Sequence, residues 1–64
     1  MIWIKKGEYY IESDCGQYTI STTYHNGEAR YSAWYKSQLL GIFVDTDKPG
    51  IDKAKYICTQ WLMG

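Results

Sequence analysis

The stretch Thr23-Tyr24-His25-Asn26-Gly27-Glu28-Ala29-Arg30 decides the fold, because Asn26-Gly27 lies between two segments of alternating side-chain character. Asn-Gly is the preferred pair for a two-residue type I′ turn, so the sequence predicts a β-hairpin at this point. His25 is then paired with Glu28, and each further pair lies one residue farther from the turn on both strands. The turn therefore fixes the register of the whole hairpin.

This register sorts the hairpin side chains onto two faces, because successive strand residues point to opposite sides of a sheet. We expect the face rich in Tyr, Ile and Ala to be the core and the other face to meet solvent or a partner. The predicted core face holds Tyr18, Ile20, Tyr24, Ala29, Ala33 and Tyr35, and the other face holds Thr19, Ser21, Thr23, Arg30, Ser32 and Trp34.

A third strand is predicted downstream, at residues 39–44, where the run is apolar at both odd and even positions. If the connection keeps Tyr35 opposite Leu40, then Leu40, Ile42 and Val44 join the core face. Leu39, Gly41 and Phe43 then lie beside Trp34 on the opposite face. A change of one residue in the length of the loop exchanges these two sets.

Two segments lie upstream of the hairpin. Residues 8–13 predict a strand that ends at the turn 14–17 and pairs antiparallel with the strand beginning at Tyr18. Residues 1–4 form either a short edge strand or a flap whose Trp3 covers apolar surface.

A helix is predicted from Ile51 onward, where apolar residues follow helical spacing. Asp47 or Thr46 can cap this helix, and Pro49 suits its first turn. The expected fold is α+β: one β-β-β-β-α domain over residues 1–64, with a three- to four-stranded antiparallel sheet and one C-terminal helix packed on one sheet face. We expect Trp61 and Ile57 to pack against Ile20 and Ala33.

Composition excludes several classes of protein. Hydrophobic residues make up 45% of the 64 residues, which excludes a disordered segment. Seven Lys and Arg balance seven Asp and Glu, so the basic excess typical of nucleic-acid and membrane-surface binding is missing. No apolar run reaches the length of a signal peptide or a membrane span. We expect a cytoplasmic protein, monomeric or homodimeric, with no membrane partner.

No residue pattern points to catalysis, to a cofactor or to a metal. His25 flanks a surface turn, and neither cysteine belongs to a paired C-x2-C motif of the kind that binds zinc. Four carboxylates have positions typical of turns and helix caps: Glu12, Asp14, Asp45 and Asp47. We expect a protein that is not an enzyme, with Cys15 and Cys58 as reduced thiols, or as one bridge if the helix lies near the 14–17 turn.

The predicted partner-binding surface is the sheet face opposite the helix. Trp and Arg are enriched among interface hot spots, which singles out Trp34 and Arg30. In one alternative, Trp3 and the N-terminal segment cover Trp34 as a second small core, and in another, two chains pair there. The complete set of predicted partner-binding residues is Trp34, Arg30, Lys36, Thr19, Thr23 and Phe43.

Four segments together resemble small phage- and prophage-encoded accessory proteins of unknown function: Trp3 with residues 10–20, then 31–34, 39–43 and 54–58. The insert at 47–50 is longer than in that pattern. The resemblance implies a bacterial cytoplasm and a non-catalytic product that binds and inhibits a host protein or nucleoprotein complex. In its most specific form, this prediction names a defence nuclease such as a CRISPR effector as the partner. A weaker, fold-level similarity to AP2-like and integrase arm-binding modules implies the alternative, a small DNA- or RNA-binding module that uses the exposed sheet face.

Overall fold

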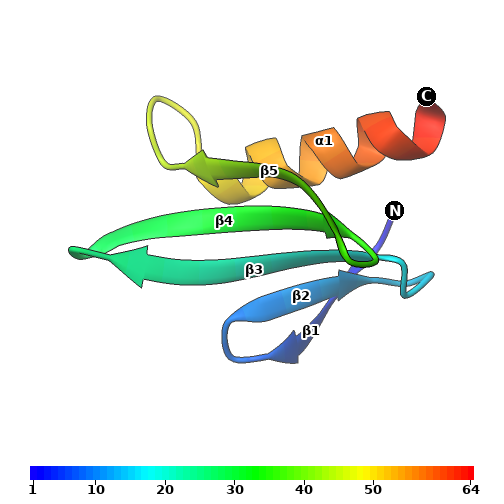
Figure 1. The fold of residues 1–64 in the computed structure, drawn as a ribbon, viewed down its shortest axis with the longest axis horizontal. Coiled ribbons are helices and arrows are strands. Elements are labelled where there is room, and N and C mark those ends of the chain that lie inside the picture. Colours follow the sequence, from blue (N-terminus) through cyan, green and yellow to red (C-terminus); the bar gives the residue numbers. More distant parts are fainter.

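The chain forms a five-stranded antiparallel sheet whose strands lie side by side in sequence order, followed by one helix (Figure 1). These elements come from a computed structural model that describes residues 1–64. The α+β class and the C-terminal helix are confirmed, but the sheet has five strands, whereas three or four were expected. The elements are β1 (Trp3–Gly7), β2 (Tyr10–Ser13), β3 (Tyr18–His25), β4 (Glu28–Tyr35), β5 (Gln38–Val44) and α1 (Gly50–Met63).

The β3–β4 hairpin has the predicted register over its whole length, from the pair His25 and Glu28 to the pair Tyr18 and Tyr35. Its turn residues Asn26 and Gly27 have φ angles of 52° and 79°. A type I′ turn requires positive φ at both central positions, and Asn and Gly tolerate that conformation best. The local preference of two residues thus aligns two eight-residue strands.

The β4–β5 pairing differs from the expected one. Tyr35 lies opposite Gln38 instead of Leu40, and the register then shifts so that Ala33 lies opposite Gly41. Leu40 is the extra residue of a β-bulge, which reverses the faces of all residues that follow it. Leu39 and Leu40 keep their expected places, since Leu39 is paired with Trp34 and Leu40 packs against the core.

The assignment of the other β5 residues was wrong as a result. Phe43 is paired with Tyr31 on the core side of the sheet, whereas Ile42 and Val44, paired with Ser32 and Arg30, lie on the opposite face. Gly41 likewise joins the core side.

The N-terminal segment is an edge strand, not a flap over Trp34. Trp3 is paired with Ser13 of β2 and packs against the hydrophobic core on the helix side. Trp3 and Trp34 therefore lie on opposite faces of the sheet, which excludes a second core formed by these two side chains.

The core lies between α1 and the centre of the sheet. Tyr18, Ile20 and Ala33 from the sheet meet Ala54 and Cys58 from the helix, and all five are buried. Because Ala33 and Ala54 are small, the helix comes close to β4, and apolar burial there supplies the main stabilisation.

Trp61 does not take the core position that the sequence suggested. It is 43% exposed and stacks on Tyr35, with ring centroids 5.8 Å apart. Cys58 and Ala54 occupy the place over Ile20 and Ala33 instead.

The helix begins differently from the expectation. Pro49 is the N-cap residue, and the Asp45 carboxylate accepts a hydrogen bond from the Gly50 N–H at 2.6 Å. Neither Thr46 nor Asp47 caps the helix; they bond to each other. Glycine suits position 50 because a Cβ there would lie 2.6 Å from the Tyr31 ring.

Candidate functional site

The sheet face opposite α1, here called the open face, is built from four rows of cross-strand neighbours. Residues that lie opposite each other in the register share a face, so the pairings define each row. The first two rows cross all five strands, the third crosses three and the fourth crosses two. The rows consist of Ile4, Glu12, Thr19, Trp34 and Leu39; of Gly7, Tyr10, Ser21, Ser32 and Ile42; of Thr23, Arg30 and Val44; and of His25 and Glu28.

On the open face, the side chains of β5 and Trp34 of β4 are apolar. Trp34 lies beside Leu39 in the first row, and Ile42 and Val44 follow in the next two rows. Leu39 is 44% exposed and Ile42 is 56% exposed, while Trp34 and Val44 are half-buried. Large apolar side chains thus remain in contact with water after the chain has folded.

The polar residues of the open face lie on the β3 side of this apolar region. Thr19 and Thr23 of β3 lie beside Trp34 and Arg30 respectively, and Ser21 is paired with Ser32 between them. The charged side chains of these rows are Arg30, Glu12 and Glu28, one cation and two anions. The open face thus exposes an apolar region at the β5 edge of the sheet, bordered by hydroxyl groups on its β3 side.

Four of the six predicted partner-binding residues lie together on this face: Trp34, Arg30, Thr19 and Thr23. Lys36 does not join them. It sits in the β4–β5 turn with a φ of 54°, and its Nζ lies 5.5 Å from the ring centroid of Tyr35, a core-side residue. Phe43 is also displaced, because the bulge at Leu40 turns it toward the helix.

Sequence reasoning missed the contribution of Ile42, Val44, Tyr10 and Ile4 to the open face. The apolar character of residues 39–44 at both odd and even positions was the available signal that both faces of β5 are apolar. Ile4 and Tyr10 follow only once β1 and β2 are paired in the observed register.

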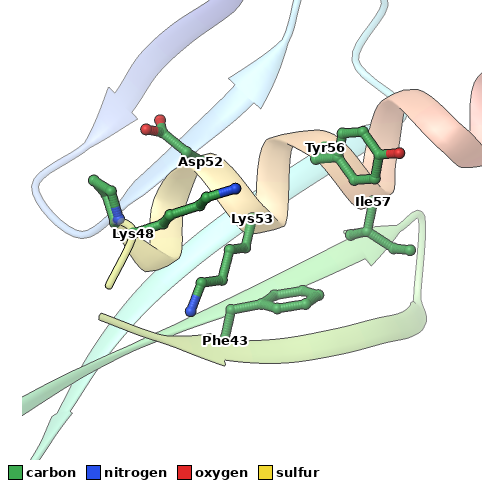
Figure 2. A pocket seen from close by; sticks show the side chains of 7 residues that line it. Phe43, Lys48, Asp52, Lys53, Tyr56 and Ile57 are labelled. Atoms are coloured by element: carbon green, nitrogen blue, oxygen red, sulfur yellow. The ribbon is translucent and has the colours of Figure 1, made fainter. Parts of the chain in front are cut away.

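A groove lies on the other side of β5, between that strand and α1. Its volume is ≈ 630 Å³, and Figure 2 shows Lys53 and Ile57 pointing from α1 toward β5, where Phe43 lies. The Lys53 Nζ donates hydrogen bonds to the Val44 carbonyl at 3.1 Å and to the Thr46 hydroxyl at 2.6 Å. The lining consists of Phe43, Lys48, Pro49, Asp52, Lys53, Tyr56 and Ile57.

The two thiols have opposite environments. The Ser13 hydroxyl, 3.2 Å from the Cys15 sulfur, and the Gln17 backbone lower the pKa of the exposed Cys15 thiol. Burial raises the pKa of the Cys58 thiol to about 11. Both are free thiols, so the disulfide alternative is not formed.

The candidate metal and acid–base residues lie apart from one another. Cys15 belongs to the β2–β3 turn, Cys58 to α1 and His25 to the end of β3. No group of three or more His, Cys, Asp or Glu side chains is close enough to hold a metal ion. The carboxylate of Asp45 bonds to the helix start, and the Thr46 hydroxyl lowers the pKa of Asp47.

Comparison with protein families, with curated proteins and with solved structures finds no match to this chain. The helix α1 lacks the length and the apolar run needed to cross a membrane.

Proposed function

We propose that this chain is a non-catalytic binding module that uses its open face to occupy a surface of another protein. The observation that carries the proposal is the apolar cluster of half-buried Trp34 with exposed Leu39 and Ile42, on a sheet face that no other element covers. Exposed apolar patches rimmed by polar residues mark interaction surfaces in soluble proteins.

The residue types support a protein partner. Trp and Arg dominate interface hot spots, and Trp34 and Arg30 stand on the same strand, on the same face. The hydroxyl side chains of Thr19, Ser21 and Ser32 supply short hydrogen-bonding groups with little side-chain entropy to lose. Such a face can fill a shallow apolar depression on its partner.

The charge of the open face supports a protein over a nucleic acid. Its rows hold one cation, Arg30, and two anions, Glu12 and Glu28, whereas phosphate binding draws on several Lys and Arg side chains. Lys36, which would have added a second cation, lies against Tyr35. The alternative of a DNA- or RNA-binding module thus rests on the ability of Trp34 to stack on a base.

The resemblance to phage and prophage accessory proteins supplies the proposed setting. There the partner is a host protein complex in the bacterial cytoplasm, and binding inhibits it. In its most specific form, the proposal names a defence nuclease such as a CRISPR effector as the partner.

Affinity purification of the tagged chain from bacterial lysate, with partners quantified by mass spectrometry, tests this proposal. Trp34→Ala and Arg30→Glu should each weaken partner binding by roughly thirtyfold, or about 2 kcal/mol. Their free energies of unfolding should change by less than about 1 kcal/mol, because these side chains lie outside the core.

Tyr24→Ala is the matched control. Tyr24 is an aromatic residue that is 64% exposed, more than Trp34, but it lies on the helix side of the sheet and its ring contacts Tyr9. Its removal should leave partner binding unchanged. Stable Trp34 and Arg30 variants that keep full binding would exclude the open face as the site, and steeply salt-dependent capture of nucleic acid would favour the alternative.

A further inference from the structure

The two edges of the sheet have opposite chemical character. The β1 edge carries Lys5 and Lys6, and its pairing with β2 is interrupted by a register shift between Lys5 and Gly7. Lysines and bulges are the devices that prevent an edge strand from pairing with another chain. The β5 edge, seven residues from Gln38 to Val44, contains no charged residue at all.

The backbone of β5 offers unpaired groups at this edge. The Val44 carbonyl accepts its hydrogen bond from Lys53 of the helix, which shows that it points away from β4. In an antiparallel pair, orientation repeats every second residue, so the N–H and C=O of Ile42 also point away from β4. Ile42 therefore presents a donor and an acceptor to the outside, without a charged side chain nearby on its strand.

We propose that two copies of this chain associate by antiparallel pairing of their β5 strands around a twofold axis at Ile42. Such an interface is self-complementary, since the Ile42 N–H of each copy faces the Ile42 carbonyl of the other. The absence of charge on β5 means that no like charges meet across the axis. The result is one continuous sheet with twice the five strands of a single copy.

The position of the helix fits this arrangement. α1 packs on β4 and β5 more extensively than on β3, so it lies near the β5 edge. Strands about 4.8 Å apart place the two helices, on the same side of the joined sheet, about 10 Å from each other. Packed helices lie about 8–10 Å apart, so the helices can be in direct contact.

The groove between β5 and α1 supplies the matching surface. Tyr56 is 65% exposed on the helix beside it, and the groove has an apolar wall of Phe43 and Ile57. Across the twofold axis, each Tyr56 can enter the groove of the other copy. The pairing involves the edge and the helix flank and does not depend on the function proposed for the open face.

Analytical ultracentrifugation of the full chain tests the proposal over a wide range of protein concentration. The wild type should approach twice the 7.5 kDa mass of one chain as its concentration rises. Ile42→Lys should weaken the dimer at least about tenfold, because it places two ammonium groups beside each other at the axis.

Ser32→Lys is the matched control for this substitution. Ser32 is the cross-strand neighbour of Ile42 on the same face, but it lies one strand inside the edge. The dimer should therefore tolerate Ser32→Lys with less than about threefold loss. Equal loss in both variants would show that copies associate through the open face, and a wild type that stays monomeric at all concentrations would overturn the proposal.

A cysteine cross-link tests the geometry directly. In a Cys15→Ser background, Ile42→Cys should form a disulfide-linked dimer under mild oxidation, because a twofold pair at position 42 brings the two Cα atoms within about 6 Å. Ser32→Cys should stay unlinked, since the two positions are then about three strand spacings apart, roughly 14 Å. Circular dichroism confirms that both variants are folded, and preferential linking of Ser32→Cys would contradict strand pairing at β5.

Discussion

Both faces of this sheet carry apolar side chains, but only one of them is covered. On the helix side, Ile20 is 1% exposed and its cross-strand neighbour Ala33 is fully buried; on the open face, Ile42 remains 56% exposed. The difference is one of side-chain size: the alanine beside Ile20 leaves room for α1, whereas the open face presents Trp34 and Arg30. Apolar alternation alone thus does not say which face becomes the core.

The largest expected effect compares two isoleucines on the two faces. Ile20→Ala should lower the free energy of unfolding by roughly 2–5 kcal/mol, because it removes a fully buried side chain and leaves a cavity. Since a domain of this size has little stability to lose, the variant should be largely unfolded at moderate temperature. Urea denaturation followed by circular dichroism measures the change.

Ile42→Ala removes the same atoms from the open face. We expect a change of no more than about 0.5 kcal/mol, because Ile42 lies mostly in water. Similar losses from the two variants would show that the open face is covered in solution, and would then point to association of the chains.

The next effect concerns pH and the buried thiol. Burial raises the pKa of Cys58 from its ordinary value near 9.0 to about 11 in the folded state. Between pH 9 and 11 the Cys58 thiol of the unfolded chain loses its proton, while the thiol of the folded chain keeps it. The free energy of unfolding is therefore unaffected by this group below about pH 9 and falls as the pH rises toward 11. The full loss should reach roughly 2–3 kcal/mol.

Urea denaturation at a series of alkaline pH values measures this dependence. Cys58→Ala should flatten the fall between pH 9 and 11, whereas Cys15→Ala should leave it in place, since Cys15 is exposed and its pKa is lowered. Part of the slope should remain in Cys58→Ala because burial also raises the pKa values of Tyr18 and Tyr31. An unchanged slope in Cys58→Ala would assign the whole dependence to those tyrosines.

The sequence was informative where a local interaction dictates structure. The Asn26-Gly27 turn and the periodicity of residues 51–62 depend on neighbours in the chain, and they correctly predicted the β3–β4 register and the helix. The bulge at Leu40 depends instead on how β5 meets β4, and nothing in residues 39–44 marks one position as the extra one. A single inserted residue exchanged Phe43 with Ile42 between the two faces.

The candidate site was predictable to the same extent. Thr19, Thr23, Arg30 and Trp34 lie on the hairpin whose register the turn fixes, so their grouping followed from the sequence. Lys36 belongs to a turn, where side-chain direction depends on a φ angle of 54° and on the nearby Tyr35 ring. Such geometry arises only after the strands have paired.

A smaller effect on stability concerns the loop that joins β5 to α1. Asp45→Ala should lower the free energy of unfolding by roughly 0.5–2 kcal/mol, because it removes the acceptor for the Gly50 N–H at the helix start. The control is Asp47→Ala, which loses only an exposed bond to Thr46 and should change stability by less than about 0.5 kcal/mol. Thermal unfolding of both variants distinguishes them, and a larger effect at Asp47 would restore the cap first expected from the sequence.

The last effect, also a small one, belongs to Trp61 near the end of the helix. Placed over Ile20 and Ala33, this side chain would stabilise the fold by roughly 3–5 kcal/mol. In its observed place it is half in water and stacks on Tyr35 at an interplanar angle of 24°, so Trp61→Ala should lower the free energy of unfolding by about 1 kcal/mol. Trp61→Phe keeps a ring against Tyr35 and should recover most of that loss. Urea denaturation monitored by far-ultraviolet circular dichroism provides the measurement, since it does not depend on tryptophan fluorescence. A loss of unfolding free energy as large as that of Ile20→Ala would mean that the core extends to the last turn of the helix, so that Trp61 belongs to the packed face of the sheet.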